Sequence, residues 1–204
     1  MANQDAPFGF RAIGGTGSSY ETQGTSKYQI NDHWTNAIFQ GDLVGMGDGT
    51  VTDRAGTQSV AGYIFGSIAA TTLNLGVFNG CFYIDPTTSK PTWKNYYPGA
   101  VNITTGTIDA YVYDNPQQLY EVQTSGTLTQ ADVGSLIDQG TYAAGSTING
   151  HSVMEIGGTS GFTTAQFRIV RLSGDPSNSD TGNANSNWVV RLNESIYYNS
   201  AILS

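Results

Sequence analysis

The stretch that decides the fold reads Asp109-Ala-Tyr-Val-Tyr-Asp-Asn-Pro-Gln-Gln-Leu-Tyr-Glu-Val-Gln-Thr124. Its first part alternates. Ala110 and Val112 share one face of an extended chain, and Tyr111 and Tyr113 share the other. A period of two with β-branched and aromatic residues is typical of a β-strand. We therefore predict a strand in which one of these two pairs is buried.

A turn and a second strand follow within the same stretch. Asp114-Asn115-Pro116 interrupts the alternation, because Asx side chains bond to the nearby backbone and proline removes a hydrogen-bond donor. Alternation then resumes over residues 119–123. The sequence predicts strand, acidic turn and strand, a scaffold unit in which nothing is arranged for chemistry.

Composition extends this reading to the whole chain. The chain has 204 residues, which is one domain or two small ones, and only 12% of them are charged, against about 25% in typical domains. Further short apolar runs recur at roughly ten-residue spacing with turn residues between them. We predict an all-β fold, a small barrel or sandwich of short antiparallel strands. The runs lie near residues 37–44, 60–66, 73–84, 167–172 and 188–192.

The domain plan has two parts. Residues 1–30 are polar and glycine-rich and are predicted to form an extended N-terminal arm, and residues 31–204 a compact all-β domain, with two sub-barrels meeting near 125 as an alternative. Phe8 and Phe10 are costly to leave in water, so we expect the arm to dock them onto a neighbouring subunit. A disordered terminus is the other interpretation.

One short helix is predicted, over residues 129–138. Thr129 and Asp132 have the spacing of a capping box, and Val133, Leu136 and Ile137 share a helical face. Gly134 weakens this helix.

Charge and cysteine content exclude several classes of protein. The net charge is −8 and the eight basic residues are scattered, so the footprint needed to bind nucleic acid is missing. No apolar run is long enough to cross a membrane, and we expect no signal peptide. Cys81 is the only cysteine, so no intrachain disulfide forms, and we expect a buried, inert thiol.

Catalytic and metal-binding patterns are weak. The two histidines, His33 and His151, lie in turn contexts, and their spacing to Cys81 matches no zinc site. We expect no enzymatic activity and no cofactor or metal. Two alternatives stay open: a hydrolase with paired carboxylates, since sixteen acidic residues are spread over the chain, and calcium in the Asn/Asp-rich loop at 175–187.

A series of short pieces, in order, resembles structural proteins of tailed bacteriophages, in particular head decoration (cement) proteins. The likeness extends from residue 8 to about 198. It implies an all-β fold without catalysis, a homotrimer, the major capsid protein as partner, and a place on the outer surface of the virion after assembly in the bacterial cytoplasm. The pieces are Phe39-Gln-Gly-Asp42, Gly76-Val-Phe-Asn-Gly80 with Phe82-Tyr83, Tyr96-Tyr-Pro-Gly99, Asp109-Ala-Tyr-Val-Tyr-Asp-Asn-Pro116, Tyr120-Glu-Val-Gln123, Ala131-Asp-Val-Gly134 and Val190-Arg-Leu-Asn193.

Contact residues follow from the aromatic side chains, because Trp and Tyr dominate binding hot spots. The segment 92–99 is read either as a lid over the core or as a contact surface. The predicted capsid or subunit contacts are Phe8, Phe10, Arg11, Trp93, Tyr96 and Tyr97. The rival function is a carbohydrate-binding or tail-adhesin module that uses Trp34, Trp93, Trp188 and the twelve tyrosines as stacking platforms.

Overall fold

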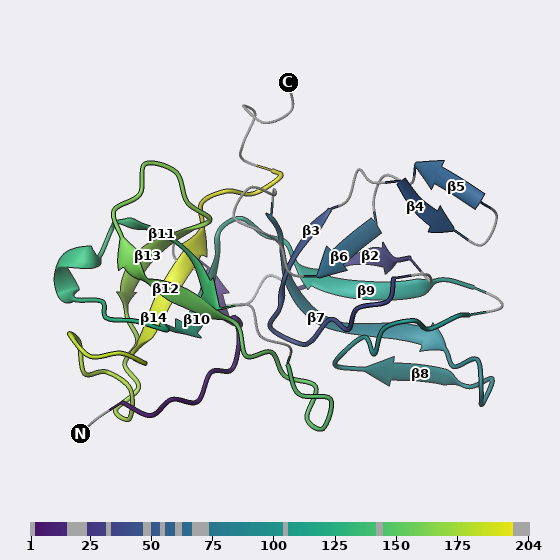
Figure 1. The fold of residues 1–204 in the computed structure, drawn as a ribbon, viewed down its shortest axis with the longest axis horizontal. Coiled ribbons are helices and arrows are strands. Elements are labelled where there is room, and N and C mark those ends of the chain that lie inside the picture. Colours follow the sequence, from purple (N-terminus) through teal and green to yellow (C-terminus); the bar gives the residue numbers. More distant parts are fainter. Residues whose placement is uncertain are drawn as a thin grey trace.

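Two lobes of β-structure lie side by side (Figure 1). The computed structural model describes residues 3–15, 24–31, 34–46, 50–53, 56–59, 63–66, 74–103, 106–141 and 145–197. Each lobe contains one six-stranded sheet, and the predicted all-β class is confirmed.

One sheet closes on itself, and we call its lobe the barrel. β3 pairs with β6 on one side and with the first part of β7 on the other, so that β3, β6, β2, β9 and β7 form a ring, and β8 extends β7 at an edge. A separate two-stranded ladder joins β4 and β5. The strands are β2 (Ser26–Ile30), β3 (Leu43–Met46), β4 (Thr50–Asp53), β5 (Gly56–Ser59), β6 (Tyr63–Gly66), β7 (Asn74–Ile84), β8 (Pro91–Lys94) and β9 (Ile108–Tyr113).

The second lobe is an open sheet in the order β1-β10-β14-β13-β11-β12. Its first two strands, β1 and β10, are neighbours, with Gly15 opposite Gln118, although the whole barrel lies between them in the sequence. The barrel is therefore inserted into the open sheet. The strands are β1 (Arg11–Gly15), β10 (Gln118–Gln123), β11 (Leu136–Thr141), β12 (Glu155–Ser160), β13 (Phe167–Leu172) and β14 (Asn187–Leu192).

The stretch 109–124 is the place where the chain leaves the barrel. The predicted strand, turn and strand are confirmed as β9 and β10 with an Asx turn between them, in which the Asn115 side chain accepts a hydrogen bond from the Gln117 N–H at 2.8 Å. The two strands do not pair with each other, since β9 belongs to the barrel and β10 to the open sheet. The turn is therefore the connection between the barrel and the open sheet.

Each lobe has its own core. In β9, Ala110 and Val112 are buried and Tyr111 and Tyr113 are half-exposed, which confirms the predicted alternation. The barrel core and the open-sheet core are distinct clusters, but Leu43 and Val77 of the barrel strands join the open-sheet core. The lobes therefore share apolar packing. The barrel core is Ile30, Ile38, Val44, Leu75, Phe78, Cys81, Tyr83, Tyr97, Val101, Ile103, Ile108, Ala110 and Val112.

The predicted N-terminal arm is wrong for the part of residues 1–30 that the structure describes. β1 and β2 are strands of the two sheets, and Phe10 is only 2% exposed, stacked on Phe167 with ring centres 4.7 Å apart. Ahead of β1, the backbone N–H of Ala6 donates to the Gln123 side chain at 3.0 Å. The physical reason is that the chain's own core offers Phe10 an apolar site, so no neighbour is needed to cover it.

The predicted helix at 129–138 is also wrong. Only a single 3-10 turn forms, at Gln130–Asp132, although its capping box is present as expected, with the Thr129 N–H donating to the Asp132 carboxylate at 2.7 Å. Gly134 then adopts a left-handed conformation, with φ of +88°, and the chain extends into β11. A glycine that readily takes positive φ ends the turn before a helix can continue. Within the described ranges, no helix is long and apolar enough to span a bilayer.

Candidate functional site

The two lobes meet at a seam built around the loop 39–42. Gly41 accepts a hydrogen bond from the Phe10 N–H at 2.9 Å and donates its own N–H to the Phe78 carbonyl, also at 2.9 Å. The same loop bonds to the segment 150–152, because the Gln40 N–H donates to the Gly150 carbonyl at 3.0 Å. The loop thus links the entry to β1, the middle of β7 and the segment that leads into β12.

Close packing at the seam requires a glycine at position 9. Gly9 has φ of +74°, and a Cβ there would lie 2.5 Å from the Cβ of Ser152. This is closer than real Cβ contacts come, so the two chain segments can approach only because Gly9 has no side chain.

Asp42 is a buried acid in the same loop. Asp42 is only 4% exposed, and its carboxylate accepts a hydrogen bond from the Phe39 N–H at 2.8 Å. Burial raises the pKa of Asp42 to about 6, and the Phe39 N–H and the Ser152 hydroxyl offset part of that effect. Asp42 is therefore a seam group that titrates in mildly acidic solution.

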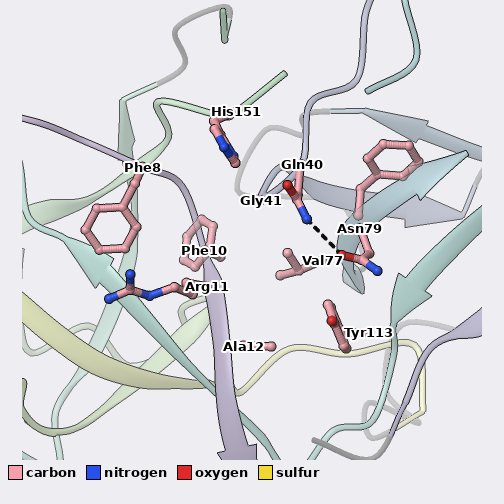
Figure 2. Close-up of a pocket in the computed structure, with 11 residues that line it drawn as sticks. Phe8, Phe10, Arg11, Ala12, Gln40, Gly41, Val77, Asn79, Tyr113 and His151 are labelled. Atoms are coloured by element: carbon pink, nitrogen blue, oxygen red, sulfur yellow. Dashed lines mark hydrogen bonds between the residues drawn. The ribbon is translucent and has the colours of Figure 1, made fainter. Parts of the chain in front are cut away.

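A cavity of about 350 Å³ opens at the seam, and we call it the seam cavity. Figure 2 shows side chains of both lobes arranged around it. Its lining combines aromatic and aliphatic groups with amide, imidazole and guanidinium groups. The lining residues are Phe8, Phe10, Arg11, Ala12, Gln40, Gly41, Val77, Phe78, Asn79, Tyr113 and His151.

The polar groups of the seam cavity are positioned by contacts among themselves and with β10. The Gln40 amide donates to the Asn79 side-chain oxygen at 3.0 Å, as Figure 2 shows. Arg11 forms an ion pair with Glu121 of β10, with its Nε donating at 3.1 Å, and its guanidinium lies 4.9 Å from the centre of the Phe8 ring. The charge of Arg11 is thus already balanced within the protein.

An apolar stripe lies on the outer face of the barrel. Phe82 and Ile84 of β7 and Trp93 of β8 are 37%, 40% and 52% exposed. The strand register places Phe82 opposite Trp93 and Ile84 opposite Pro91. We call these four residues, together with Tyr111, the aromatic stripe.

The aromatic stripe is held rigidly. Trp93 packs against Tyr111 with ring centres 5.1 Å apart, and Gly80 lies beneath the indole, where a Cβ would come within 2.7 Å of it. On the β2 side, Lys27 and Asp109 form an ion pair at 2.8 Å. The stripe is therefore a fixed apolar surface with a charged border.

The six predicted contact residues lie in different places in the fold. Phe8 and Arg11 line the seam cavity and Trp93 belongs to the stripe. Tyr96 is half-buried and stacks on Phe39 with ring centres 5.8 Å apart.

Two of the six are wrong as contacts, Phe10 and Tyr97. Tyr97 is fully buried, and its hydroxyl donates to the Trp34 carbonyl at 2.9 Å. Phe82 and Ile84 were not among the predicted contacts, although their alternation with Cys81 and Tyr83 in the sequence indicates that they share one face of the strand.

The described residues hold few groups suited to catalysis. Cys81 is buried, which raises the pKa of its thiol to about 12, as expected for an inert cysteine. Burial raises the pKa of Glu194, and the nearby Asp138 carboxylate adds to the effect, but neither acid lines the seam cavity. His33 lies outside the described residues. Within the described part of the chain, no cluster of three His, Cys, Asp or Glu side chains could hold a metal ion.

Comparisons of the chain with models of protein families, with curated proteins and with solved structures find no match. The seam cavity and the aromatic stripe are therefore the observations from which a function can be argued.

Proposed function

We propose that this protein is a head decoration protein of a tailed bacteriophage, which binds the outside of the capsid through the aromatic stripe and stabilises the shell. The observation that carries the proposal is the exposure of Phe82, Ile84 and Trp93 side by side on paired strands. A soluble protein seldom leaves such a contiguous apolar patch in water unless a partner covers it. The resemblance to decoration proteins names the major capsid protein as that partner.

The form of the stripe suits a binding surface. Its side chains stand on paired strands, so little conformational entropy is lost when a partner covers them. Large apolar anchors at the centre with charged groups at the border are the usual arrangement of an interface hot spot. The Lys27–Asp109 pair supplies such a border.

Weak contacts by individual chains are enough to stabilise a capsid. A protein that binds only the assembled shell stabilises it by mass action, by about 2.7 kcal/mol per site at a hundred times the Kd. If three chains act together, as the resemblance to trimeric decoration proteins suggests, avidity exceeds single-site affinity by roughly 10²–10⁴. The net charge of −8 suits an outer coat, which has no DNA phosphate to neutralise.

Self-association is part of the proposal, with a homotrimer as the expected state. Phe10 is occupied by its own core, so the contact between subunits must use other surfaces. Sedimentation of the isolated protein tests this point, and a monomer at micromolar concentration contradicts it.

The decisive experiment adds the protein to shells of its source phage from which it has been stripped. The wild-type protein should bind to a fixed copy number and raise the temperature at which DNA is released. Trp93→Ala combined with Phe82→Ser should abolish binding while the protein stays folded. The matched control is Phe162→Ala, since Phe162 is 43% exposed and does not belong to the stripe.

Two outcomes contradict the proposal. Shells rebuilt with wild-type protein that release DNA at the temperature of stripped shells show that it does not stabilise the capsid. Localisation of the protein at the tail tip favours an adhesin.

The tryptophan-based carbohydrate module has lost support. Trp188 is fully buried and Trp34 packs against the barrel core, so Trp93 is the one exposed platform of the three. An extended sugar-stacking surface needs more than one such ring.

A further inference from the structure

We propose that the seam cavity is a binding site for a neutral sugar residue. This goes beyond capsid binding and uses a surface distinct from the aromatic stripe. Four features of the cavity support this proposal: its size, its hydrogen-bonding groups, its apolar lining and its charge.

The size fits a small ligand. A volume of about 350 Å³ falls at the lower end of the range of small-molecule sites, about 300–1,000 Å³. The cavity lies between two lobes, and ligand sites occur preferentially at such boundaries.

Several hydrogen-bonding groups of the cavity have no partner among the described residues. The Gln40 side-chain amide donates one N–H to the Asn79 side-chain oxygen. The Gln40 side-chain oxygen and the Asn79 amide N–H groups can therefore bond to a ligand. Tyr113 and His151 also line the cavity, and among the described residues the Tyr113 hydroxyl and the His151 imidazole have no hydrogen-bond partner. These groups include both donors and acceptors, which is what a ligand hydroxyl needs, because it both donates and accepts.

Part of the lining is apolar. Phe8, Ala12 and Val77 line the cavity with side chains that have no hydrogen-bonding groups. A pyranose ring has the same division, since its C–H groups form an apolar face and its hydroxyl groups surround the edge. In Figure 2, Phe8 and Gln40 come from different sides of the cavity, so one ring can meet both kinds of surface.

Charge selects a neutral ligand over an anionic one. Arg11, the cation of the lining, is already paired with Glu121, and the chain as a whole carries −8. A purely apolar ligand is disfavoured for a different reason. It would cover the Gln40, Asn79 and His151 side chains without replacing their hydrogen bonds to water, and burying polar groups without hydrogen-bond partners is unfavourable.

The test measures binding of neutral saccharides to the full-length protein. Immobilised oligosaccharides of glucose, galactose, mannose and N-acetylglucosamine are compared with sialylated ones, and hits are titrated by calorimetry. Asn79→Ala, Tyr113→Phe and His151→Ala should each weaken binding about 2- to 10-fold, the amount expected for one lost hydrogen bond. Trp93→Ala and Tyr111→Phe, on the stripe, should bind as the wild type does.

The variants are chosen so that misfolding cannot be mistaken for lost binding. Tyr113→Phe removes a single oxygen atom and His151 is exposed, so both proteins should keep the wild-type melting temperature. Loss of binding in Trp93→Ala alone places the sugar on the stripe and overturns the proposal. Preference for sialylated sugars, or no saccharide bound at millimolar concentration, also overturns it. Since no capsid enters this assay, its result is independent of the decoration function.

Discussion

The hydroxyl of Tyr120, in the core of the open sheet, donates a hydrogen bond of 2.8 Å to the backbone carbonyl of Tyr113, the last residue of β9. The two residues flank the turn at which the chain leaves the barrel. Burial of Tyr120 raises the pKa of its phenol, so the group stays protonated and acts as the donor. One side chain thus fixes the end of the barrel to the core of the other lobe.

Removing that hydroxyl should loosen the connection between the lobes. We expect Tyr120→Phe to lower the free energy of unfolding by about 1–3 kcal/mol, because the Tyr113 carbonyl loses its partner in a largely buried place. Tyr111→Phe, a half-exposed position of β9, serves as the control and should change stability by less than about 0.5 kcal/mol. Urea denaturation measures both, and equal effects in the two variants contradict the role given to Tyr120.

Val112 tests the predicted alternation of β9. Val112→Ala should cost about 1–3 kcal/mol, since its side chain is fully buried in the barrel core. The same change at Val170, which is half-buried on β13, should cost distinctly less. A loss below about 0.5 kcal/mol at Val112 would mean that this face of β9 is not core.

Asp42 should make stability depend on pH. Its pKa in the folded protein, about 6, lies above its ordinary value of 3.8, so the folded state favours the protonated acid. The resulting stability is present below about pH 4 and is lost as pH rises through 6, by about 3 kcal/mol for a shift of roughly two units.

Asp42→Asn isolates this effect, because its amide oxygen can still accept the bond from the Phe39 N–H. The difference in unfolding free energy between variant and wild type should grow in favour of the variant between pH 4 and 6 and then level off. A difference that stays constant over this range shows that Asp42 is not the titrating group.

Gly9 and Gly24 form a matched pair for the seam. Both have positive φ, +74° and +79°, so alanine at either position carries a backbone strain of about 1–2 kcal/mol. Only at Gly9 does the new Cβ also meet Ser152, while nothing lies within 4 Å at Gly24. Gly9→Ala should therefore be less stable than Gly24→Ala by about a further 1–3 kcal/mol, the cost of overpacking. Equal melting curves would show that the seam adapts without cost.

Sequence patterns correctly predicted the local features, which depend on residues that are neighbours in the chain. The alternation of β9, the Asx turn and the capping box at Thr129 are local, and each forms as expected. The helix was mispredicted because three apolar positions at helical spacing were given more weight than Gly134. In the structure the backbone preference of that glycine decides the outcome.

The candidate site depends on contacts between distant residues, which no local pattern contains. Phe8 and Phe10 have the same context in the sequence and both line the seam cavity, but Phe8 is half-buried, whereas Phe10 is only 2% exposed and is stacked on Phe167 in the core. Tyr96 and Tyr97 are neighbours in the sequence, but Tyr96 is half-buried and Tyr97 is fully buried. Which member of such a pair is accessible follows from the pairing of strands, and therefore only from the fold.

The position of the barrel between β1 and β10 has a consequence for the order of folding. Gly15 and Gln118 can pair only after the ends of about 100 residues have been brought together, and closing so long a flexible loop costs about 4 kcal/mol of chain entropy. A barrel that folds first removes most of this cost, because its own structure holds its two ends near each other. The open sheet should then assemble late, and during synthesis β1 must wait for its partner until the barrel has left the ribosome.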